Sequence, residues 1–256
     1  MSFDVEEFDI ALDYNNSISK EEQLAVGYRG LVNVMKLLAK HDQIKCTFFT
    51  TAFFATHFPE TIQNISVRHE IASHTCSNSS FKKGDLLISK TVLEEITSQP
   101  IHGFRMPQMK TIEMKELKKV PYSYDASINP TWLPGRYNNL NISRTAFYED
   151  GMVRIPASVS TNLRIPLFWL SFKNFPYSYF KLLAKAALKK DGYLSLYFHP
   201  WEFTDLSAYK IPWFIKNHSK AALLNKLNHF IEDFQKNAEF ITMYDFLKRK
   251  TFIQNE

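Results

Sequence analysis

Strand-type and helix-type patterns alternate along almost the whole of this 256-residue chain. Residues 20–41 carry apolar side chains at mostly three- and four-residue spacing, which predicts an amphipathic helix. Residues 45–51 form a β-rich run bounded by polar residues, which predicts a buried strand. Further helices are expected at residues 59–66, 111–119, 177–190, 221–236 and 243–250, and one that ends at 94–98. Further strands are expected at residues 69–74, 101–105, 122–128, 153–156, 193–198 and 240–242.

This alternation predicts an α/β fold. Strands that alternate with helices make a parallel sheet, which either closes into a barrel or is doubly wound. The chain is long enough for one large domain and shows no internal repeat, low-complexity segment or linker. We therefore expect a single domain over residues 1–256, with the 15% of aromatic residues filling its core or lining a groove.

The charge distribution argues against a nucleic-acid partner. The net charge of +5 comes from scattered lysines, and the basic clusters at 118–119, 189–190 and 248–250 are too short for a nucleic-acid arm. Cys46 and Cys76 have no metal-type spacing and are expected to be reduced, buried thiols, with a disulfide as the minority option.

The sequence carries no targeting or membrane-spanning pattern. The N-terminus is acidic, and no stretch reaches the ~18 uninterrupted apolar residues that a spanning helix needs. We expect a cytoplasmic protein if Met1 is the native start; the alternative is a chain trimmed of a targeting segment.

Four carboxylates crowd the first ten residues. They follow Ser2 and Phe3, which are strand-type, and they are Asp4, Glu6, Glu7 and Asp9. The two-residue period of a strand places Asp4 and Glu6 on the same side, near the strand end. Two such acids can divide the work, one binding a divalent metal and one moving a proton. The alternative is a solvated acidic N-terminus.

Other polar residues also follow predicted strands. His74 and Asn78 would share a face if the chain turns helical after the strand at 69–74. Arg105 can fix a carboxylate, Asp125 is a further acid at a strand end, and His199 ends the strand at 193–198. Each alone can be structural, but polar residues that gather at the carboxyl ends of parallel strands indicate a site.

The order of these motifs resembles that of the polysaccharide deacetylase family (carbohydrate esterase family 4, NodB-homology domain) across nearly the whole chain. The matching segments are Phe3-Asp4-Val5-Glu6, His74 to Asn78, Arg105-Met106-Pro107, Asp125 as a loose match, and Leu196 to His199. The ending Phe-His-Pro-Trp-Glu suggests the branch whose first motif is Asp-x-Glu or Asp-x-Asp.

The resemblance implies a distorted (β/α)7-type barrel of mainly parallel strands and a hydrolase that removes acetyl groups from an N- or O-acetylated sugar. It implies a general base, Asp4, oriented by Arg105. It implies a general acid, His199, which Asp125 tunes. It also implies a divalent metal, usually zinc, held by an acid and two histidines, here Glu6, His74 and the position of Asn78. The expected substrate is a polysaccharide or lipid-linked glycan of the bacterial cell envelope.

Asn78 departs from the family pattern, because the second histidine ligand is expected there. An amide oxygen is a poorer donor for zinc than an imidazole. The site is then vacant, holds a harder metal, or recruits Glu7 or Asp9. The alternative function is a metal-deficient, carbohydrate-binding pseudoenzyme of the same fold.

Residues 167–180 contain seven aromatic side chains and are followed by Lys181 and Lys185. The favoured interpretation is a loop and helix that cover the barrel. The alternative is contact with the inner membrane surface, where the protein would handle a lipid-linked sugar or act as a peripheral scaffold. Three aromatic residues are candidates to stack on sugar rings: Trp132, Tyr137 and Trp201.

Overall fold

A computed structural model describes residues 1–250 and contains an eight-stranded sheet in the order β10-β1-β2-β3-β4-β5-β9-β8. All neighbours pair in parallel except β8 and β9, which are antiparallel. The strands are β1 (Ser2–Val5), β2 (Thr47–Thr50), β3 (Glu70–Ser73), β4 (Gly103–Phe104), β5 (Tyr124–Asp125), β8 (Phe147–Glu149), β9 (Met152–Arg154) and β10 (Tyr197–Phe198). The predicted α/β fold of mainly parallel strands in one domain is confirmed.

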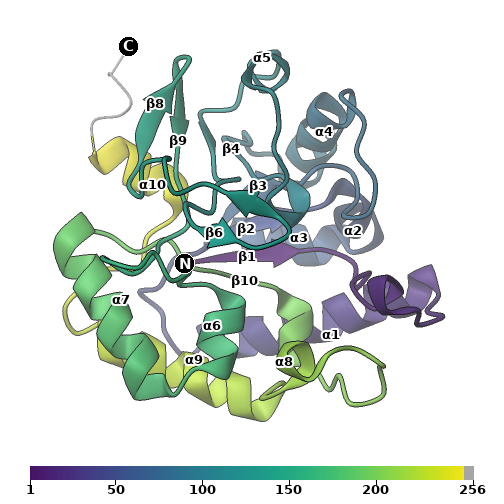
Figure 1. Cartoon of the computed structure of the whole chain (residues 1–256). Helices are drawn as coiled ribbons and strands as arrows, with labels where there is room; N and C mark the ends of the chain where they lie inside the picture. The colour runs from purple at the N-terminus through teal and green to yellow at the C-terminus, as the bar shows by residue number, and fades with distance from the viewer. Residues whose placement is uncertain (251–256) are drawn as a thin grey trace.

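The sheet curls into a distorted half-barrel, with helices on its outside (Figure 1). Its edge strands are β8 and β10, and hydrogen bonds join the segment that follows β9 to the segment that precedes β10. Ser158 N donates to Ser195 O at 2.8 Å, and Ser195 N donates to Ser158 Oγ at 2.9 Å. These bonds bring the last strand close to the middle of the chain, so both can contribute to one site.

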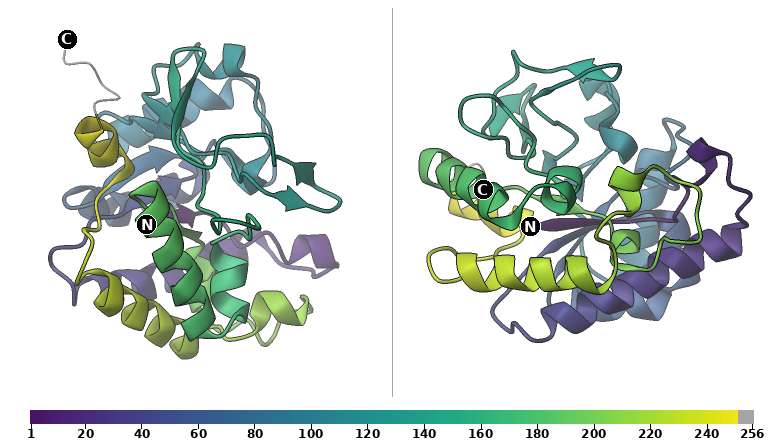
Figure 2. Two further views of the ribbon diagram at one scale, coloured as in Figure 1. Left: turned by 60° about the vertical axis from the view of Figure 1, so that its left-hand side comes forward. Right: turned by 60° about the horizontal axis from the view of Figure 1, so that its bottom comes forward.

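The helices surround the sheet. They are α1 (Lys20–Leu38), α2 (Ala52–His57), α3 (Pro59–Ser66), α4 (Asp85–Thr97), α5 (Met114–Leu117), α6 (Trp169–Asn174), α7 (Tyr177–Asp191), α8 (Trp213–Lys216), α9 (Ala221–Phe234) and α10 (Met243–Arg249), with 3₁₀ turns η1 (Leu12–Tyr14), η2 (Pro107–Met109) and η3 (Pro200–Phe203). Helices α1 and α9 lie side by side (Figure 2). Among residues 1–250, no helix combines the length and the apolar character that crossing a membrane requires.

The predicted helices are confirmed, but the strand predicted at 240–242 is wrong. Those residues lie outside any strand, and Phe240 O accepts one backbone hydrogen bond, from Lys45 N at 3.0 Å. Thr242 instead begins α10, where its hydroxyl accepts a hydrogen bond from Asp245 N at 3.0 Å. The hairpin of β6 (Trp132–Leu133) and β7 (Tyr137–Asn138) was not predicted.

The alternation of β1 determines where its side chains point. All four residues of β1 are buried. Phe3 packs against other rings, with centroids 5.2 Å from Phe48 and 6.0 Å from Phe198. Ser2 and Asp4 point to the opposite face, where both contact Arg105. The predicted two-residue period therefore delivers Asp4 to the interior of the half-barrel. Cys46 and Cys76 are free thiols, as predicted, although Cys76 is only half-buried.

Candidate active site

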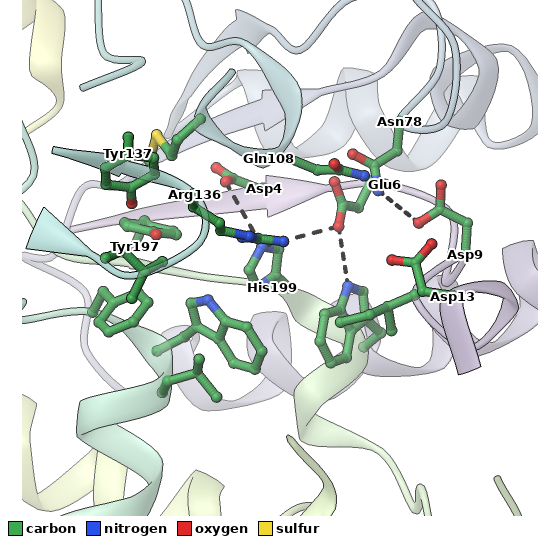
Figure 3. Close-up of a pocket in the computed structure, with 17 residues that line it drawn as sticks. Asp4, Glu6, Asp9, Asp13, Asn78, Gln108, Arg136, Tyr137, Tyr197 and His199 are labelled. Carbon is green, nitrogen blue, oxygen red and sulfur yellow. Dashed lines mark hydrogen bonds and ion pairs between the residues drawn. The ribbon is translucent and has the colours of Figure 1, made fainter. Parts of the chain in front are cut away.

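A pocket opens beyond the carboxyl end of β1, and many of the predicted site residues line it (Figure 3). Asp4, Glu6 and His199 point toward one another at its centre. Asn78, Asp9 and Asp13 form one end, and Tyr137 and Tyr197 form the other. The pocket thus has an acidic end and an aromatic end, with a base-type and an acid-type group between them.

Arg105 holds Asp4 from behind. Arg105 Nη1 lies 2.5 Å from Asp4 Oδ1, and both side chains are buried. Arg105 also donates to Ser2 Oγ at 3.0 Å and to Ala126 O at 3.2 Å, and its guanidinium lies 4.0 Å from the ring centroid of Phe49. The charge-assisted bond therefore compensates the buried carboxylate and fixes its direction.

His199 lies across the pocket from Asp4. Its Nε2 is 3.9 Å from Asp4 Oδ2 and 4.0 Å from Glu6 Oε1, while its Nδ1 is 3.2 Å from Glu202 Oε1. The ring stacks on Trp201 at a centroid distance of 4.9 Å. Burial alone would lower the pKa of His199, but the hydrogen bond to Glu202 and the nearby carboxylates outweigh burial and raise the pKa above its ordinary value. The imidazole therefore tends to carry a proton that it can donate.

Glu6 Oε2 and His74 Nε2 face each other inside the half-barrel. His74 Nδ1 lies 2.8 Å from Arg105 O, and a carbonyl can only accept, so Nδ1 carries the proton of the neutral ring. Burial lowers the pKa of His74 and raises the pKa of Glu6. His74 Nε2 then presents its lone pair to Glu6 Oε2 at 3.2 Å. A proton on Glu6, which its raised pKa favours, or a cation in place of that proton bridges the two atoms.

Asn78 lines the same pocket as Glu6, but it does not lie on a helix, which was the condition for His74 and Asn78 to share a face. Thr75 adopts a left-handed φ of 64°, which turns the chain after β3. Asn78 Nδ2 donates to Asp9 Oδ1 at 2.6 Å, and Asn78 N donates to Glu7 Oε1 at 3.0 Å. Among the described residues, the buried Asn78 Oδ1 has no hydrogen-bond partner.

These contacts allow a test of whether the residues suit a divalent metal. In residues 1–250, no three His, Cys, Asp or Glu side chains are grouped so that they can hold an ion. Glu6 and His74 supply two suitable donors, and the His74 Nδ1–carbonyl bond is the usual support of a ligating histidine. The unpaired oxygen of Asn78 is a third, neutral donor. The set fits a weakly held ion better than a tight zinc site.

The two acids proposed as replacement ligands are differently placed. Glu7 is fully buried, and its oxygens accept from Asn78 N at 3.0 Å and from Thr51 Oγ1 at 3.1 Å, so it braces the loop. Asp9 lines the pocket and binds Asn78 Nδ2. Burial raises the pKa of Asp9 to about 6. Asp9 is therefore the acid that is available beside Asn78.

The structure places Glu202, rather than Asp125, at the imidazole of His199. Asp125 is fully buried and accepts from Arg154 Nε at 2.8 Å and from Ser127 N at 3.1 Å. Glu202 lies three residues after His199 in η3, where its side chain accepts from His199 N at 2.7 Å. The sequence signal for this contact was the glutamate that ends the His-Pro-Trp-Glu run.

The predicted sugar-stacking residues separate into three environments. Tyr137, on β7, lines the pocket. Trp201 is buried beneath His199 and donates from Nε1 to Glu6 Oε1 at 3.2 Å, so it forms a wall. Trp132 is 60% exposed on β6, outside the pocket lining. Arg136, in the turn of the same hairpin, also lines the pocket and was not predicted.

The aromatic segment 167–180 packs onto the barrel. Phe172 and Phe180 are fully buried, and both contact Phe230 of α9. Trp169 meets the edge of His199 at a centroid distance of 5.1 Å. These contacts support the covering role that was favoured from the sequence.

Two glycines in α1 let the helix approach the site segments closely. A Cβ on Gly27 would lie 2.5 Å from Glu6 O, and a Cβ on Gly30 would lie 1.9 Å from Pro200 O. The helix backbone therefore positions both the segment after β1 and the segment after β10. The sequence did show this feature, as two glycines inside a predicted helix of a glycine-poor chain.

Solved structures share this architecture. A protein from Mycobacterium smegmatis named as a polysaccharide deacetylase has a TM-score of 0.65 and 18% identity, covering 100% of this chain and 91% of that chain. A protein from Pseudomonas aeruginosa PAO1, also named as a polysaccharide deacetylase, has a TM-score of 0.63 and 15% identity, covering 99% and 85%. The Puue allantoinase has a TM-score of 0.59 and 17% identity, covering 86% and 73%.

No family model matches the chain, and no curated protein sequence matches it. The structural similarities show that the chain has the fold of the polysaccharide deacetylases. The particular branch suggested by the first and last motifs stays a prediction.

Proposed function

We propose that this protein is a hydrolase that removes an acetyl group from an N- or O-acetylated sugar. The observation that carries the proposal is the pair formed by Asp4 and His199. Asp4 Oδ2 and His199 Nε2 lie 3.9 Å apart at the centre of one pocket, and each is held from its far side, by Arg105 and by Glu202. A base and an acid that flank one point are what acyl transfer to water requires.

The residues divide the reaction between them. Asp4 takes a proton from the attacking water, and Arg105 keeps its carboxylate directed at the pocket. His199 gives a proton from Nε2 to the departing amine or alkoxide, since its raised pKa favours the protonated ring. A divalent ion held by Glu6, His74 and Asn78 would supply Lewis-acid polarisation of the acetyl carbonyl.

The proposed substrate is a sugar ring inside a polysaccharide or a lipid-linked glycan. Tyr137 and Tyr197 offer an aromatic surface at one end of the pocket, which suits the apolar face of a sugar ring. The names of the similar structures point to the same substrate class. A role in envelope assembly and a place at the inner membrane surface stay predictions.

The second candidate is a carbohydrate-binding pseudoenzyme of the same fold. The observation that favours it is the amide of Asn78, which donates to Asp9 beside Glu6 and His74. Against it stands the supported pair of Asp4 and His199, because a protein that only binds sugar needs neither a held base nor a held acid.

Acetate release separates the two candidates. Metal-stripped protein is given zinc, cobalt, manganese or nickel and tested on acetylated sugars and aryl acetates, beside His199→Ala. Acetate release that the variant abolishes supports the deacetylase. Sugar binding without acetate release under every condition supports the pseudoenzyme.

A further inference from the structure

Two fully buried charged side chains lie behind His199, on the side away from Asp4. Glu202 and Lys173 each have an exposed fraction of 0%, and Glu202 Oε2 lies 3.4 Å from Lys173 Nζ. Lys173, on α6, also donates to Ile215 O at 2.6 Å. A chain of contacts therefore runs from Ile215 through Lys173 and Glu202 to the imidazole.

Fold stability alone gives a poor account of this arrangement. Taking two charges out of water costs several kcal/mol per ion, and apolar residues of similar volume are often as stable or more stable in such places. The pair also joins two segments far apart in the chain, α6 and η3, at His199, which faces the pocket. Its position points to a role in holding His199.

The contacts of Glu202 specify one form of the ring. Glu202 Oε1 accepts from His199 N at 2.7 Å and lies 3.2 Å from His199 Nδ1. An ionised carboxylate can only accept, so His199 Nδ1 must be the protonated nitrogen that faces it. The stacked ring of Trp201 and the edge of Trp169 hold the imidazole plane.

We propose that Glu202 is a positioning residue that locks His199 in the Nδ1–H tautomer with Nε2 aimed at the pocket, and that Lys173 holds Glu202 in place. This role rests on the proposed function for its effect on catalysis. Only the Nε2 proton is then transferred to a leaving group, and the neutral ring that remains keeps its proton on Nδ1. The carboxylate that orients the acid therefore comes from the last motif and not from Asp125.

The ring tautomer of the wild-type protein is the first test, and it needs no activity. Nitrogen NMR of histidine-labelled protein, at a pH where His199 is neutral and with His199→Gln to assign the signal, shows which nitrogen carries the proton. The proposal expects Nδ1–H. A neutral His199 protonated on Nε2 would overturn it, whether or not the protein releases acetate.

Kinetics of matched variants form the second test. Glu202→Gln is compared with Asp205→Asn, because Asp205 also pairs with a lysine, Lys220, at 3.4 Å but is exposed. We expect kcat to fall about 10–100-fold in E202Q with KM nearly unchanged, as for other residues that orient a reacting group. We expect D205N to match the wild type.

A double variant separates this role from folding. Glu202→Gln with Lys173→Met removes both buried charges together, so neither is left unpaired. We expect this protein to fold, to show a detectable Nε2–H tautomer of His199, and to keep the lowered kcat. A folded double variant with wild-type kcat and an unchanged tautomer would refute the positioning role.

Discussion

Gly30 lies against the carbonyl of Pro200 so closely that a Cβ at position 30 would be 1.9 Å from that oxygen. Pro200 directly follows His199, so helix α1 packs against the backbone next to the proposed general acid. Gly27, three residues earlier in α1, makes a similar approach to Glu6 O. The position of both sides of the pocket therefore depends on a helix that contributes no side chain to its chemistry.

We predict that Gly30→Ala destabilises the protein. Alanine is favoured over glycine within a helix by about 1 kcal/mol, but the added methyl group must displace the backbone of η3. Overpacking of this kind costs about 1–3 kcal/mol, so the net free energy of unfolding should fall, and acetate release should fall with it because His199 moves. Urea unfolding and a rate assay measure both effects.

Gly84→Ala is the matched control, because a Cβ at Gly84 would meet no atom within 4 Å. We expect this variant to keep wild-type stability and activity. Equal stability of G30A and G84A would contradict the claim that the contact between α1 and η3 positions the site.

Asp9 should make stability depend on pH in a specific direction. Burial raises the pKa of its carboxyl group from 3.8 to about 6. The folded state therefore binds this proton more tightly than the unfolded state, so stability is greatest below the unfolded pKa and falls as the pH rises through about 6. Asp9→Asn keeps an acceptor for Asn78 but cannot ionise, so it should escape this loss.

The measurement is urea unfolding of metal-stripped protein across pH. The stability of D9N relative to wild type should increase by up to about 3 kcal/mol between about pH 4 and about pH 8. Asp13→Asn removes an exposed carboxylate from the same pocket and should leave the pH dependence nearly unchanged. If the free energy of unfolding changes with pH in the same way for D9N and wild type, burial does not raise the pKa of Asp9 and the prediction is wrong.

Asn78→His should restore a strong third ligand beside Glu6 and His74. The new imidazole would stand where Asp9 can accept its second N–H, which is the usual support of a ligating histidine. We expect zinc affinity, measured by competition with a chelating dye, to rise at least about 10–100-fold. Asn138→His, at an exposed position of β7, is the control for added histidine. Unchanged affinity in N78H would mean that position 78 is not the missing ligand.

The sequence was most informative where local periodicity decides the structure. The two-residue period predicted that Asp4 and Glu6 lie on one side of the first strand, and both line the pocket, because a pleated strand alternates regardless of its neighbours. The spacing of apolar residues likewise predicted α1, and Ser19 caps it by accepting from Glu22 N at 3.2 Å. The carboxyl ends of parallel strands then brought Asp4 and His199 together.

Local sequence patterns did not predict the features that depend on tertiary contacts. The place of Asn78 follows from the left-handed turn at Thr75, which the sequence does not mark with glycine. Glu202 meets Lys173 only because α6 packs beside η3, so Asp125 was the natural choice from motif order. The composition of residues 240–242 predicted a strand, but the Thr242 side chain instead caps the N-terminus of α10.

The leaving-group dependence of His199→Ala tests the central claim most directly. Acetate release from an acetamido sugar needs a protonated leaving group, whereas 4-nitrophenyl acetate does not. If Asp4 and His199 act as base and acid, the rate of acetate release by H199A should fall about 10²–10⁴-fold with the sugar and far less with the aryl ester. Equal losses on both substrates, or no acetate release by the metal-loaded wild-type protein, would contradict the account.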